Sequence, residues 1–388
     1  MARVLLTGFC AVPGPHRAGV QLRHVIRALI PQHAVDLLVV RDGEQAHVER
    51  QGEARILRVP TPESNPRSQI ESFQRALRRQ LDGADYDIVH CRDCWSAIPV
   101  VAARARSRFA MIYDLARSPT GELAFDAALG AQYARDERTC VAAADLVLAP
   151  TAAAAEALDG GNRGRAAVTP LGVDIDRFDW DAGPSSKLPR ILYVGALEAG
   201  RGVRGLVRAM AAIVRELDAR LVLAGPVAQG FAHDLRHAID ERGVAERVEL
   251  LGAIDHARVP ALLATATVCV VPAAAAADPC PTKLLEYMAC RRAIVAPRRA
   301  AIAEVVADDR EALLFEPGDP QDLARTILRL LEASLLRERL ADAAYDRVRR
   351  DFTASAARRA VRGAYDSIVE RFEIEPDAEH AVARPERL

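Results

Sequence analysis

The chain has 388 residues, with 52 basic and 53 acidic side chains and a formal net charge of −1. At roughly 100–200 residues per domain, this length predicts two domains and excludes a single small module. Half of the residues are apolar and 27% are charged, as in ordinary globular proteins, which excludes a disordered or collagenous chain. Because the charges balance, no overall field would attract nucleic acid or an anionic bilayer. Any anion must therefore bind at a local site.

Cysteine usage and hydropathy indicate the compartment. The seven cysteines are an odd number scattered over a long chain, which favours reduced thiols over a disulfide framework. The first apolar run is too short for a convincing signal peptide. The most apolar stretch, from Leu262, is interrupted by Pro272 and falls short of the roughly 20 residues that a spanning helix needs. With arginine in place of nearly every lysine, we expect a bacterial, cytoplasmic protein, and peripheral association with a membrane stays open.

Short β-branched runs alternate along the chain with longer amphipathic stretches, which is the pattern of βα units around a parallel sheet. In the first part of the chain, strands are predicted to begin at Arg3, Val35, Ala54, Tyr86, Phe109, Asp145 and Ala166. Residues 172–189 contain turn formers and charges without helical periodicity, so they are predicted to form a linker.

The same pattern restarts after this linker. Strands are predicted to begin at Arg190, Arg220, Arg247, Thr267 and Ala293, and helices to cover about 202–217, 233–242, 259–264 and 282–290. From Pro320 to about Phe372 the chain is predicted to be helical almost throughout. The fold class is therefore α/β, with two doubly wound, Rossmann-like domains. In such sheets ligands bind beyond the carboxyl ends of the strands at the switch point, and a cleft between two domains is the default active site.

The segment DPCPTKLLEYMACRRAIVAP, residues 278–297, contains Asp278 and Glu286 eight positions apart. A helix that begins near Thr282 would offer unpaired amides and its dipole to a phosphate, and Lys283 would add a full charge. Glu286, one turn further on, could accept hydrogen bonds from two adjacent hydroxyls, as on a ribose. Spacing alone is equally compatible with an ordinary amphipathic helix in which Glu286 is a surface charge.

This segment resembles the E-x7-E signature of retaining GT-B glycosyltransferases of family four (glycosyl transferases group 1), in the variant P-x-K-L-x-E-Y-M-A. Further matches follow in the family's order: AADLVLAPT, VTPLGVDIDRF, ILYVGALEAGRGVRGLVRAM and RVELLGAIDHARVPALLATATVCVVP. The series covers most of residues 1–333. The resemblance implies a GT-B fold, two Rossmann-like domains facing across a cleft. Residues 1–172 would bind the acceptor, residues 190–350 the nucleotide sugar, and a helix over 351–373 would pack back toward the first domain.

The resemblance also implies roles for individual residues. Glu286 stands where the family binds the nucleotide ribose, and Asp278, one methylene shorter than the usual Glu, stands where it contacts the donor sugar. Ala196 replaces an Arg that binds the donor diphosphate, whereas Arg201 keeps a positive charge in place of a Lys. Arg201 and Lys283, with the helix start, are thus expected to stabilise the leaving group.

The first βα loop resembles the family's glycine loop. Ala18 and Gly19 stand in place of a Gly-Gly pair, so Gly19 is expected to allow the close approach of the backbone to the donor phosphates and the acceptor. Arg17 lies beside them and could partly replace the missing cation. As an isolated turn before a helix, the same loop would indicate nothing about function.

Further candidates lie at strand ends. Asp114 and Arg117 resemble the Y-E-x-R variant of some subfamilies, and a carboxylate there could orient the sugar or accept a proton. An aspartate that caps the following loop is an equally good interpretation of Asp114. His90 ends another strand, where a lone histidine is more often structural.

Metal and redox chemistry receive little support. Cys91 and Cys94 form a C-x2-C, but no second pair at zinc-finger spacing accompanies them, so a functional dithiol is the minor interpretation. The chain has no P-loop, no G-x-S-x-G and no D-x-D suited to a metal diphosphate. The resemblance implies catalysis without a bound metal and without a cofactor, the donor being a UDP- or GDP-sugar.

The sequence thus predicts a hexosyl- or related glycosyltransferase that moves a sugar from a nucleoside-diphosphate sugar to a glycan, lipid-linked or small-molecule acceptor, with retention implied by the resemblance. The alternative is a catalytically weak homologue that binds a nucleotide or sugar, or that scaffolds a biosynthetic complex. Ala196 and Asp278 favour this alternative, whereas Lys283 and Glu286 count against it. A dinucleotide-dependent oxidoreductase would need a G-x-G-x-x-G after a first strand, and neither domain has one.

Overall fold

The computed structural model describes residues 1–12, 17–30, 32–63, 65–115, 127–158, 164–178, 188–228, 230–272 and 282–374. The chain divides into two compact units. Unit 1 comprises Met1–Pro150, Ala154–Pro170 and Ala357–Leu388, and unit 2 comprises Thr151–Ala153 and Leu171–Ala356. Each unit contains a mostly parallel sheet with helices on both of its faces.

The described part of unit 1 has an eight-stranded sheet in the order β3-β4-β2-β1-β5-β6-β7-β8. The strands are β1 (Arg3–Ala11), β2 (Ala34–Val40), β3 (Val48–Gln51), β4 (Ala54–Val59), β5 (Ile88–Cys91), β6 (Ala110–Asp114), β7 (Leu146–Ala149) and β8 (Ala166–Val168). Strand β3 runs antiparallel to β4, and the other pairings are parallel. The order of the strands reverses between β1 and β5, so the carboxyl ends of these strands form the switch point of unit 1.

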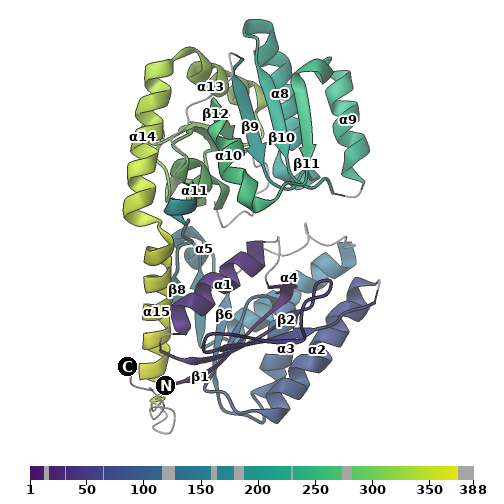
Figure 1. Cartoon of the computed structure of the whole chain (residues 1–388), viewed down its shortest axis with the longest axis vertical. Helices are drawn as coiled ribbons and strands as arrows, with labels where there is room; N and C mark the ends of the chain where they lie inside the picture. Colours follow the sequence, from purple (N-terminus) through teal and green to yellow (C-terminus); the bar gives the residue numbers. More distant parts are fainter. Residues whose placement is uncertain are drawn as a thin grey trace, which may run out of the picture. The chain divides into compact units, whose positions relative to one another are not determined.

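The helices of unit 1 form two layers (Figure 1). They are α1 (Arg17–Leu29), α2 (Pro66–Gly83), α3 (Cys94–Ala103), α4 (Ala127–Ala143), the short α5 (Ala152–Glu156) from Ala154 on, and α15 (Ala354–Arg371) from Ala357 on. Phe73, Trp95 and Tyr133 bring α2, α3 and α4 onto one face of the sheet. Leu22 of α1 and Tyr365 of α15 are buried against the other face.

Local signals position α3 directly after β5. The Asp93 side chain accepts a hydrogen bond from the Ser96 N–H at 2.9 Å, and the Ser96 side chain returns to the Asp93 backbone, which completes a capping box. The other Asp93 carboxylate oxygen accepts from the Phe9 N–H at 2.7 Å. The start of α3 is therefore tied to the carboxyl end of β1, beside the switch point.

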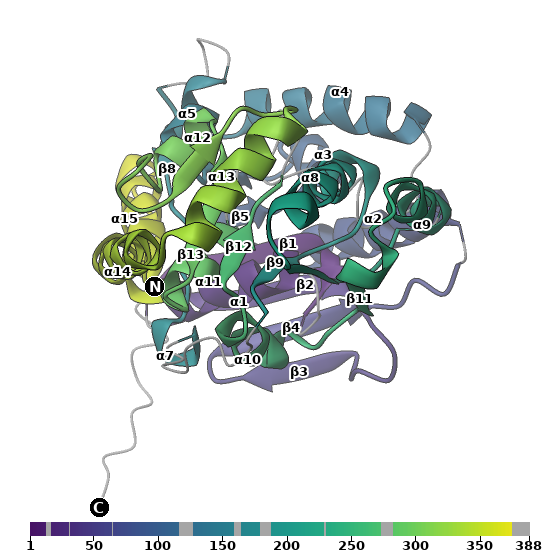
Figure 2. The ribbon, with the colours of Figure 1, turned by 90° about the horizontal axis from the view of Figure 1, so that it is seen from above.

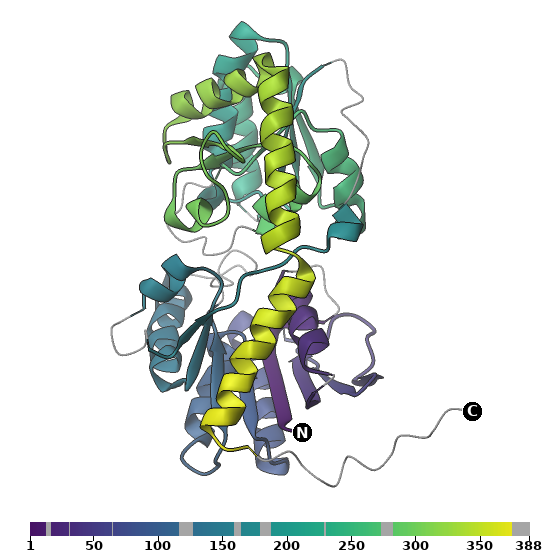
Figure 3. The same ribbon diagram turned by 90° about the vertical axis from the view of Figure 1, so that its left-hand side faces the viewer.

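Helix α15 comes from the far end of the chain and completes the core of unit 1. Figure 3 shows this helix in yellow, lying along the strands of unit 1. Ala364, Tyr365 and Ile368 are buried with residues of β1, β5 and β6. Arg362 donates from Nε to the Ala28 carbonyl at 2.9 Å, which fastens α15 to the end of α1.

The described part of unit 2 has a six-stranded parallel sheet in the order β11-β10-β9-β12-β13-β14. The strands are β9 (Arg190–Val194), β10 (Arg220–Ala224), β11 (Val248–Gly252), β12 (Val268–Val270), β13 (Ala293–Pro297) and β14 (Leu313–Phe315). The order reverses between β9 and β12, so the switch point of unit 2 lies at the carboxyl ends of these two strands.

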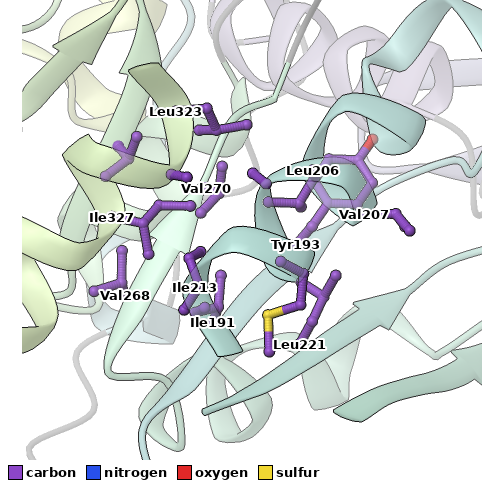
Figure 4. Close-up of a cluster of buried hydrophobic side chains, with 14 of the residues drawn as sticks. Ile191, Tyr193, Leu206, Val207, Ile213, Leu221, Val268, Val270, Leu323 and Ile327 are labelled. Atoms are coloured by element: carbon purple, nitrogen blue, oxygen red, sulfur yellow. The ribbon is translucent and has the colours of Figure 1, made fainter. Parts of the chain in front are cut away.

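Helices cover both faces of this sheet as well. They are α7 (Ile175–Phe178), α8 (Val203–Glu216), α9 (Phe231–Glu241), α10 (Val259–Ala264), α11 (Thr282–Ala289), α12 (Ala300–Ala303), α13 (Pro320–Glu332) and α14 (Ser334–Asp351), with the 3-10 turns η2 (Ala199–Arg201), η3 (Ala245–Arg247) and η4 (His256–Arg258). Figure 2 shows α8 and α13 side by side. Their apolar faces pack on β9, β10 and β12 through residues that include Leu206, Ile213 and Ile327 (Figure 4). Helices α10, α11 and α14 pack on the opposite face.

The structure contains every strand that the sequence predicts and adds β3, β14 and α7. The four residues of β3 are all exposed, so they lack the apolar alternation that would reveal a strand. Strand β14 has only three residues, and α7 places four helical residues inside the predicted linker 172–189. A single helical turn is too short to show a period of 3.6 residues. No helix among the described residues is long and apolar enough to cross a bilayer.

Candidate functional site

The switch point of unit 2 is where the sequence places nucleotide recognition. Helix α11 begins after the chain has left β12, and its buried face carries Leu284, Leu285 and Met288. The Tyr287 hydroxyl accepts a hydrogen bond from the Val194 N–H at 3.0 Å, at the last residue of β9. This bond fixes α11 beside the end of the central strand.

Glu286 is buried in this helix, with an exposed fraction of only 5%. Its Oε1 lies 2.9 Å from Nε2 of His256. Its Oε2 lies 3.6 Å from Nζ of Lys283, which is an ion pair beyond hydrogen-bond length. Oε2 is buried and has no hydrogen-bond partner. The alternative in which Glu286 is an exposed surface charge is therefore wrong, because its side chain is buried.

The electrostatic balance keeps Glu286 ionised. Burial alone would raise the pKa of Glu286, but the charge of Lys283 and the hydrogen bond from His256 outweigh burial, and the pKa of this carboxyl lies below its ordinary value. A buried carboxylate with one oxygen lacking a donor is an acceptor for hydroxyl groups.

His256, which is one third exposed on η4, is not among the site residues that the sequence predicts. Its ring also contacts the ring of Phe178, with 5.8 Å between the centroids. The available signal was its place: His256 follows β11, and parallel strands collect functional side chains at their carboxyl ends. A lone histidine thirty positions before Glu286 shows no motif, so only the tertiary structure reveals the pair.

Two glycines shape the connection after β9. A Cβ on Gly225 would collide with the carbonyl oxygen of Gly195, so the chain segments after β9 and β10 touch through backbone alone. A Cβ on Gly195 would lie 3.5 Å from Cε of Lys283, which places the Lys283 side chain beside this connection. The Tyr193 hydroxyl donates to the Ala196 carbonyl at 3.0 Å. Lys283 thus lies at the end of β9, as a phosphate-binding role would need.

Arg201 has a separate arrangement. It lies on η2, and its Nε is 2.7 Å from Oε1 of Glu198. Glu198 is largely buried, so part of the positive charge that the sequence assigns to a diphosphate is balanced inside the protein. The structure therefore brings Lys283 and Glu286 together, while Arg201 belongs to another ion pair of the same unit.

In unit 1, Asp114 is one half of a buried ion pair. Its Oδ2 lies 2.6 Å from Nη1 of Arg92, and the two side chains are 17% and 8% exposed. Arg92 follows β5 directly, and its N–H donates to the Thr7 carbonyl at 2.9 Å. Nε of Arg92 is buried without a hydrogen-bond partner. Sequence reasoning named Asp114 but missed Arg92, which the register of β5 and β6 places on the same face of the sheet.

His90 and Gly19 have structural explanations in unit 1. His90 is fully buried, its Nδ1 lies 2.7 Å from the Tyr365 hydroxyl, and burial lowers the pKa of His90 to about 4. A Cβ on Gly19 would collide with the Ala11 carbonyl. Glycine is thus required at this point for α1 to pack against the end of β1, whether or not a ligand approaches.

Other predicted residues lie outside the described residues or carry no site. Asp278, Arg117 and the Arg17 side chain are not among the described positions. Cys91 and Cys94 are free and buried, and burial raises the pKa of both thiols, which opposes thiolate chemistry. Among the described residues no group of three or more His, Cys, Asp or Glu could hold a metal ion.

Two protein families match the chain. The model of the glycosyl transferase 4-like domain matches residues 18–172, and the model of glycosyl transferases group 1 matches residues 188–333. Together they cover most of both sheets.

Curated relatives are similar over part of their length. Alpha-D-kanosaminyltransferase of Streptomyces kanamyceticus is 30% identical over 182 residues, which are 46% of this chain and 46% of the relative. D-inositol 3-phosphate glycosyltransferase 2 of Catenulispora acidiphila is 32% identical over 225 residues, 53% of this chain and 52% of the relative. The chain spans about half the length of these relatives.

Solved structures are similar over nearly the whole chain. Sucrose-phosphate synthase from Thermosynechococcus elongatus superposes with a TM-score of 0.81 at 20% identity, covering 96% of this chain and all of that one. Anabaena HepE in complex with UDP and glucose superposes with a TM-score of 0.77 at 19% identity, covering 95% and 100%. At these identities the likeness shows the fold, and the predicted GT-B fold with two Rossmann-like domains is confirmed.

Proposed function

This chain belongs to the GT-B glycosyltransferases, and from that premise we propose that it transfers a sugar from a nucleoside-diphosphate sugar to an acceptor hydroxyl with retention of configuration. In the proposed reaction, the bond between the anomeric carbon and the diphosphate breaks, and its electron pair stays on the diphosphate. The acceptor oxygen bonds to the anomeric carbon from the same face, and the hydroxyl proton passes to the leaving diphosphate.

Glu286 is the observation that carries this proposal. Its Oε2 is a buried, ionised acceptor without a donor, and it lies beside the switch point where nucleotides bind in doubly wound sheets. Ribose hydroxyls supply donors of the required kind. Some structures similar to this one, such as Anabaena HepE, were solved with UDP, which supports a nucleotide as the ligand class.

The diphosphate would meet fixed positive charge. Lys283 lies beside Gly195 at the end of β9, and Thr282 opens α11, whose amino-terminal end carries the positive end of the helix dipole. Arg201 would add charge through its fork of N–H groups, although Nε is held by Glu198. Fixed cations and a helix start can stabilise the leaving group electrostatically, so we expect turnover without a divalent metal.

Unit 1 is proposed to bind the acceptor. Asp114 is held by Arg92 at the carboxyl end of β6, and a carboxylate fixed in this way would accept a hydrogen bond from a sugar or acceptor hydroxyl. Asp278 would contact the donor sugar, as the family resemblance implies.

The proposal is tested first by nucleotide binding. Glu286→Gln removes the charge but keeps the shape, so affinity for UDP or GDP should fall by about 1.5–3 kcal/mol, the range for a hydrogen bond to a charged group. Isothermal titration measures this, and Glu246→Gln, an exposed carboxylate of unit 2, is the matched control. Equal affinity in Glu286→Gln and the parent would refute the assignment. Mass spectrometry and NMR of products from candidate donors and acceptors then test transfer and retention.

A catalytically weak homologue is the second candidate. The ion pair with Glu198 favours this candidate, because it partly neutralises Arg201, the cation that is left in the connection after β9 once Ala196 replaces the family's arginine. For an active enzyme, alanine at Arg201 or Lys283 should each reduce turnover at least tenfold, or about 1.4 kcal/mol of barrier. Ala196→Arg should raise turnover. If neither alanine variant changes turnover, the scaffold interpretation is preferred.

A further inference from the structure

The connection after β11 places His256 against Glu286, the residue proposed to bind the ribose. His256 has no role in the proposed reaction. Nε2 of His256 lies 2.9 Å from Oε1 of Glu286. An ionised carboxylate can only accept hydrogen bonds, so Nε2 must carry the proton and donate it. The contact is therefore directional, with the imidazole as donor and the glutamate as acceptor.

His256 is held on its other side as well. Its ring contacts Phe178, which is 2% exposed, and the Phe178 carbonyl accepts a hydrogen bond from the Cys290 thiol at 3.2 Å. Cys290 directly follows α11. The Asp255 side chain caps η4 by accepting from the Ala257 N–H at 2.8 Å. The imidazole is thus fixed between α7 and α11, the helix that carries Glu286.

This arrangement makes the two carboxylate oxygens of Glu286 unequal. Oε1 has a donor, whereas Oε2 is buried, has no hydrogen-bond partner and has only the ion pair with Nζ of Lys283 at 3.6 Å. Without the bond to Oε1, the carboxylate could rotate about its terminal torsion, which has broad energy wells. With one oxygen anchored, the lone pairs of the other keep a fixed direction.

We propose that His256 is a positioning residue for nucleotide recognition, which anchors Oε1 of Glu286 so that Oε2 faces the ribose hydroxyls. This inference rests on the proposed function, in which Glu286 binds the ribose. His256 acts through Glu286, and it does not itself select the base or the phosphates.

The experiment compares the ribonucleotides UDP and GDP with their 2′,3′-dideoxy analogues by isothermal titration to the full chain. The parent should prefer the ribonucleotide by about tenfold or more, as expected for hydrogen bonds to a charged acceptor. His256→Phe keeps a ring against Phe178 but removes the donor. In this variant the ratio of the affinities for the ribonucleotide and the dideoxy analogue should fall by at least about two thirds. The affinity for the dideoxy analogue itself should change less than about twofold. His256→Gln, which restores an amide donor, should recover the preference. His233→Ala, an exposed histidine of α9, is the matched control.

The outcomes distinguish the role of His256 from the role of Glu286. Equal weakening of ribo and dideoxy nucleotides in His256→Phe would mean direct contact with the nucleotide and would overturn the positioning role. An unchanged preference in this variant, together with its loss in Glu286→Gln, would overturn the positioning role and leave the proposed function standing. A parent protein without any ribose preference would refute both the positioning role of His256 and the ribose-binding role of Glu286, while transfer itself is tested separately by product analysis. Thermal denaturation reports folding, and His256→Ala serves as the second variant if His256→Phe is unstable.

Discussion

The buried charges of Arg92, Asp114 and Glu286 occur with partners, and the partners define what each charge can do. Arg92 and Asp114 form an ion pair with both side chains mostly buried, whereas Glu286 is balanced by His256 and Lys283 and keeps one oxygen unoccupied. Removing a charge from water costs several kcal/mol, which a partner only partly restores. Asp114, which has its counter-charge, and Glu286, which keeps one oxygen without a hydrogen-bond donor, should therefore respond differently to mutation.

The pair in unit 1 can be tested by removing one partner. Arg92→Leu leaves the Asp114 carboxylate largely buried without its counter-charge, so the free energy of unfolding should fall by about 3–5 kcal/mol. Arg92→Leu combined with Asp114→Leu should recover most of this loss. Chemical denaturation of the parent, of Arg92→Leu and Asp114→Leu singly, and of the double variant measures the coupling. If the double variant were no more stable than Arg92→Leu, the pair would not be the cause.

At this scale, the sequence predicts the charged residues of the site but not their partners in other elements. Glu286 and Lys283 share one helix, so their proximity follows from a spacing of three residues. The partners of Glu286 and Asp114 in other elements, His256 and Arg92, become visible only when the order of the strands is known. A parallel sheet aligns the ends of strands that are far apart in sequence, and no local pattern records that alignment.

At the scale of elements, glycines show where helices touch their sheets. Gly19→Ala would force a methyl group against the Ala11 carbonyl, so α1 should shift and the melting temperature should fall, with a cost of about 1–3 kcal/mol. Gly205 in α8 provides the matched control, because a Cβ there would meet open space. Gly205→Ala should stabilise its helix by about 0.5–1 kcal/mol. Calorimetric scans of both variants measure the contrast, and a neutral Gly19→Ala would show that the contact is not rigid.

Because His90 contacts Tyr365 of α15, the free energy of unfolding is expected to depend on pH. Because burial lowers the pKa of His90 to about 4, against an ordinary value of 6.5, His90 contributes stability that is fully present above pH 6.5. That stability, about 3 kcal/mol, should be lost as pH falls from 6.5 to about 4. Burial also lowers the pKa of His33, whose ring lies 5.9 Å from Tyr365, so it acts in the same direction.

Denaturation at several pH values tests this. His90→Gln cannot gain a proton, so the variant should lose less stability than the parent between pH 6.5 and 4. Asp114 and Arg92 act on His90 with opposite signs and remain unchanged in the variant. Parallel curves for the parent and the variant would show that His90 does not cause the acid sensitivity.

Element prediction from the sequence succeeded where apolar periodicity was strong. The buried strands and the long helices α8 and α13 have clear patterns, since one side of each packs in the core. Strand β3 was not predicted because all four of its residues are exposed. Antiparallel pairing with β4 at the edge of the sheet, and not burial, holds this strand. Chain pairing at a sheet edge leaves no mark in hydropathy.

At the scale of the whole molecule, the two units repeat one plan. Each has a mostly parallel sheet in which the strand order reverses beside the first strand of the unit. In each unit, proposed functional residues or their partners come after the strand next to this reversal: Arg92 after β5, and Lys283 and Glu286 after β12. The sequence predicted this plan because alternating βα units restart after residue 189. It could not predict which strand ends become neighbours, since that depends on the order of the strands and not on their number.

The return of residues 357–374 to unit 1 has a consequence for biosynthesis. Val4, Leu6, Ile88 and His90 belong to the first quarter of the chain, yet the surface that they present is covered by Tyr365 and Ile368, which the ribosome adds much later. Domains generally fold as they emerge, N-terminal first. Here the amino-terminal half must wait through the synthesis of about 200 further residues with an apolar stripe uncovered, whereas residues 171–356 can fold as soon as they leave the tunnel. We therefore expect the second unit to complete its fold before the first during synthesis.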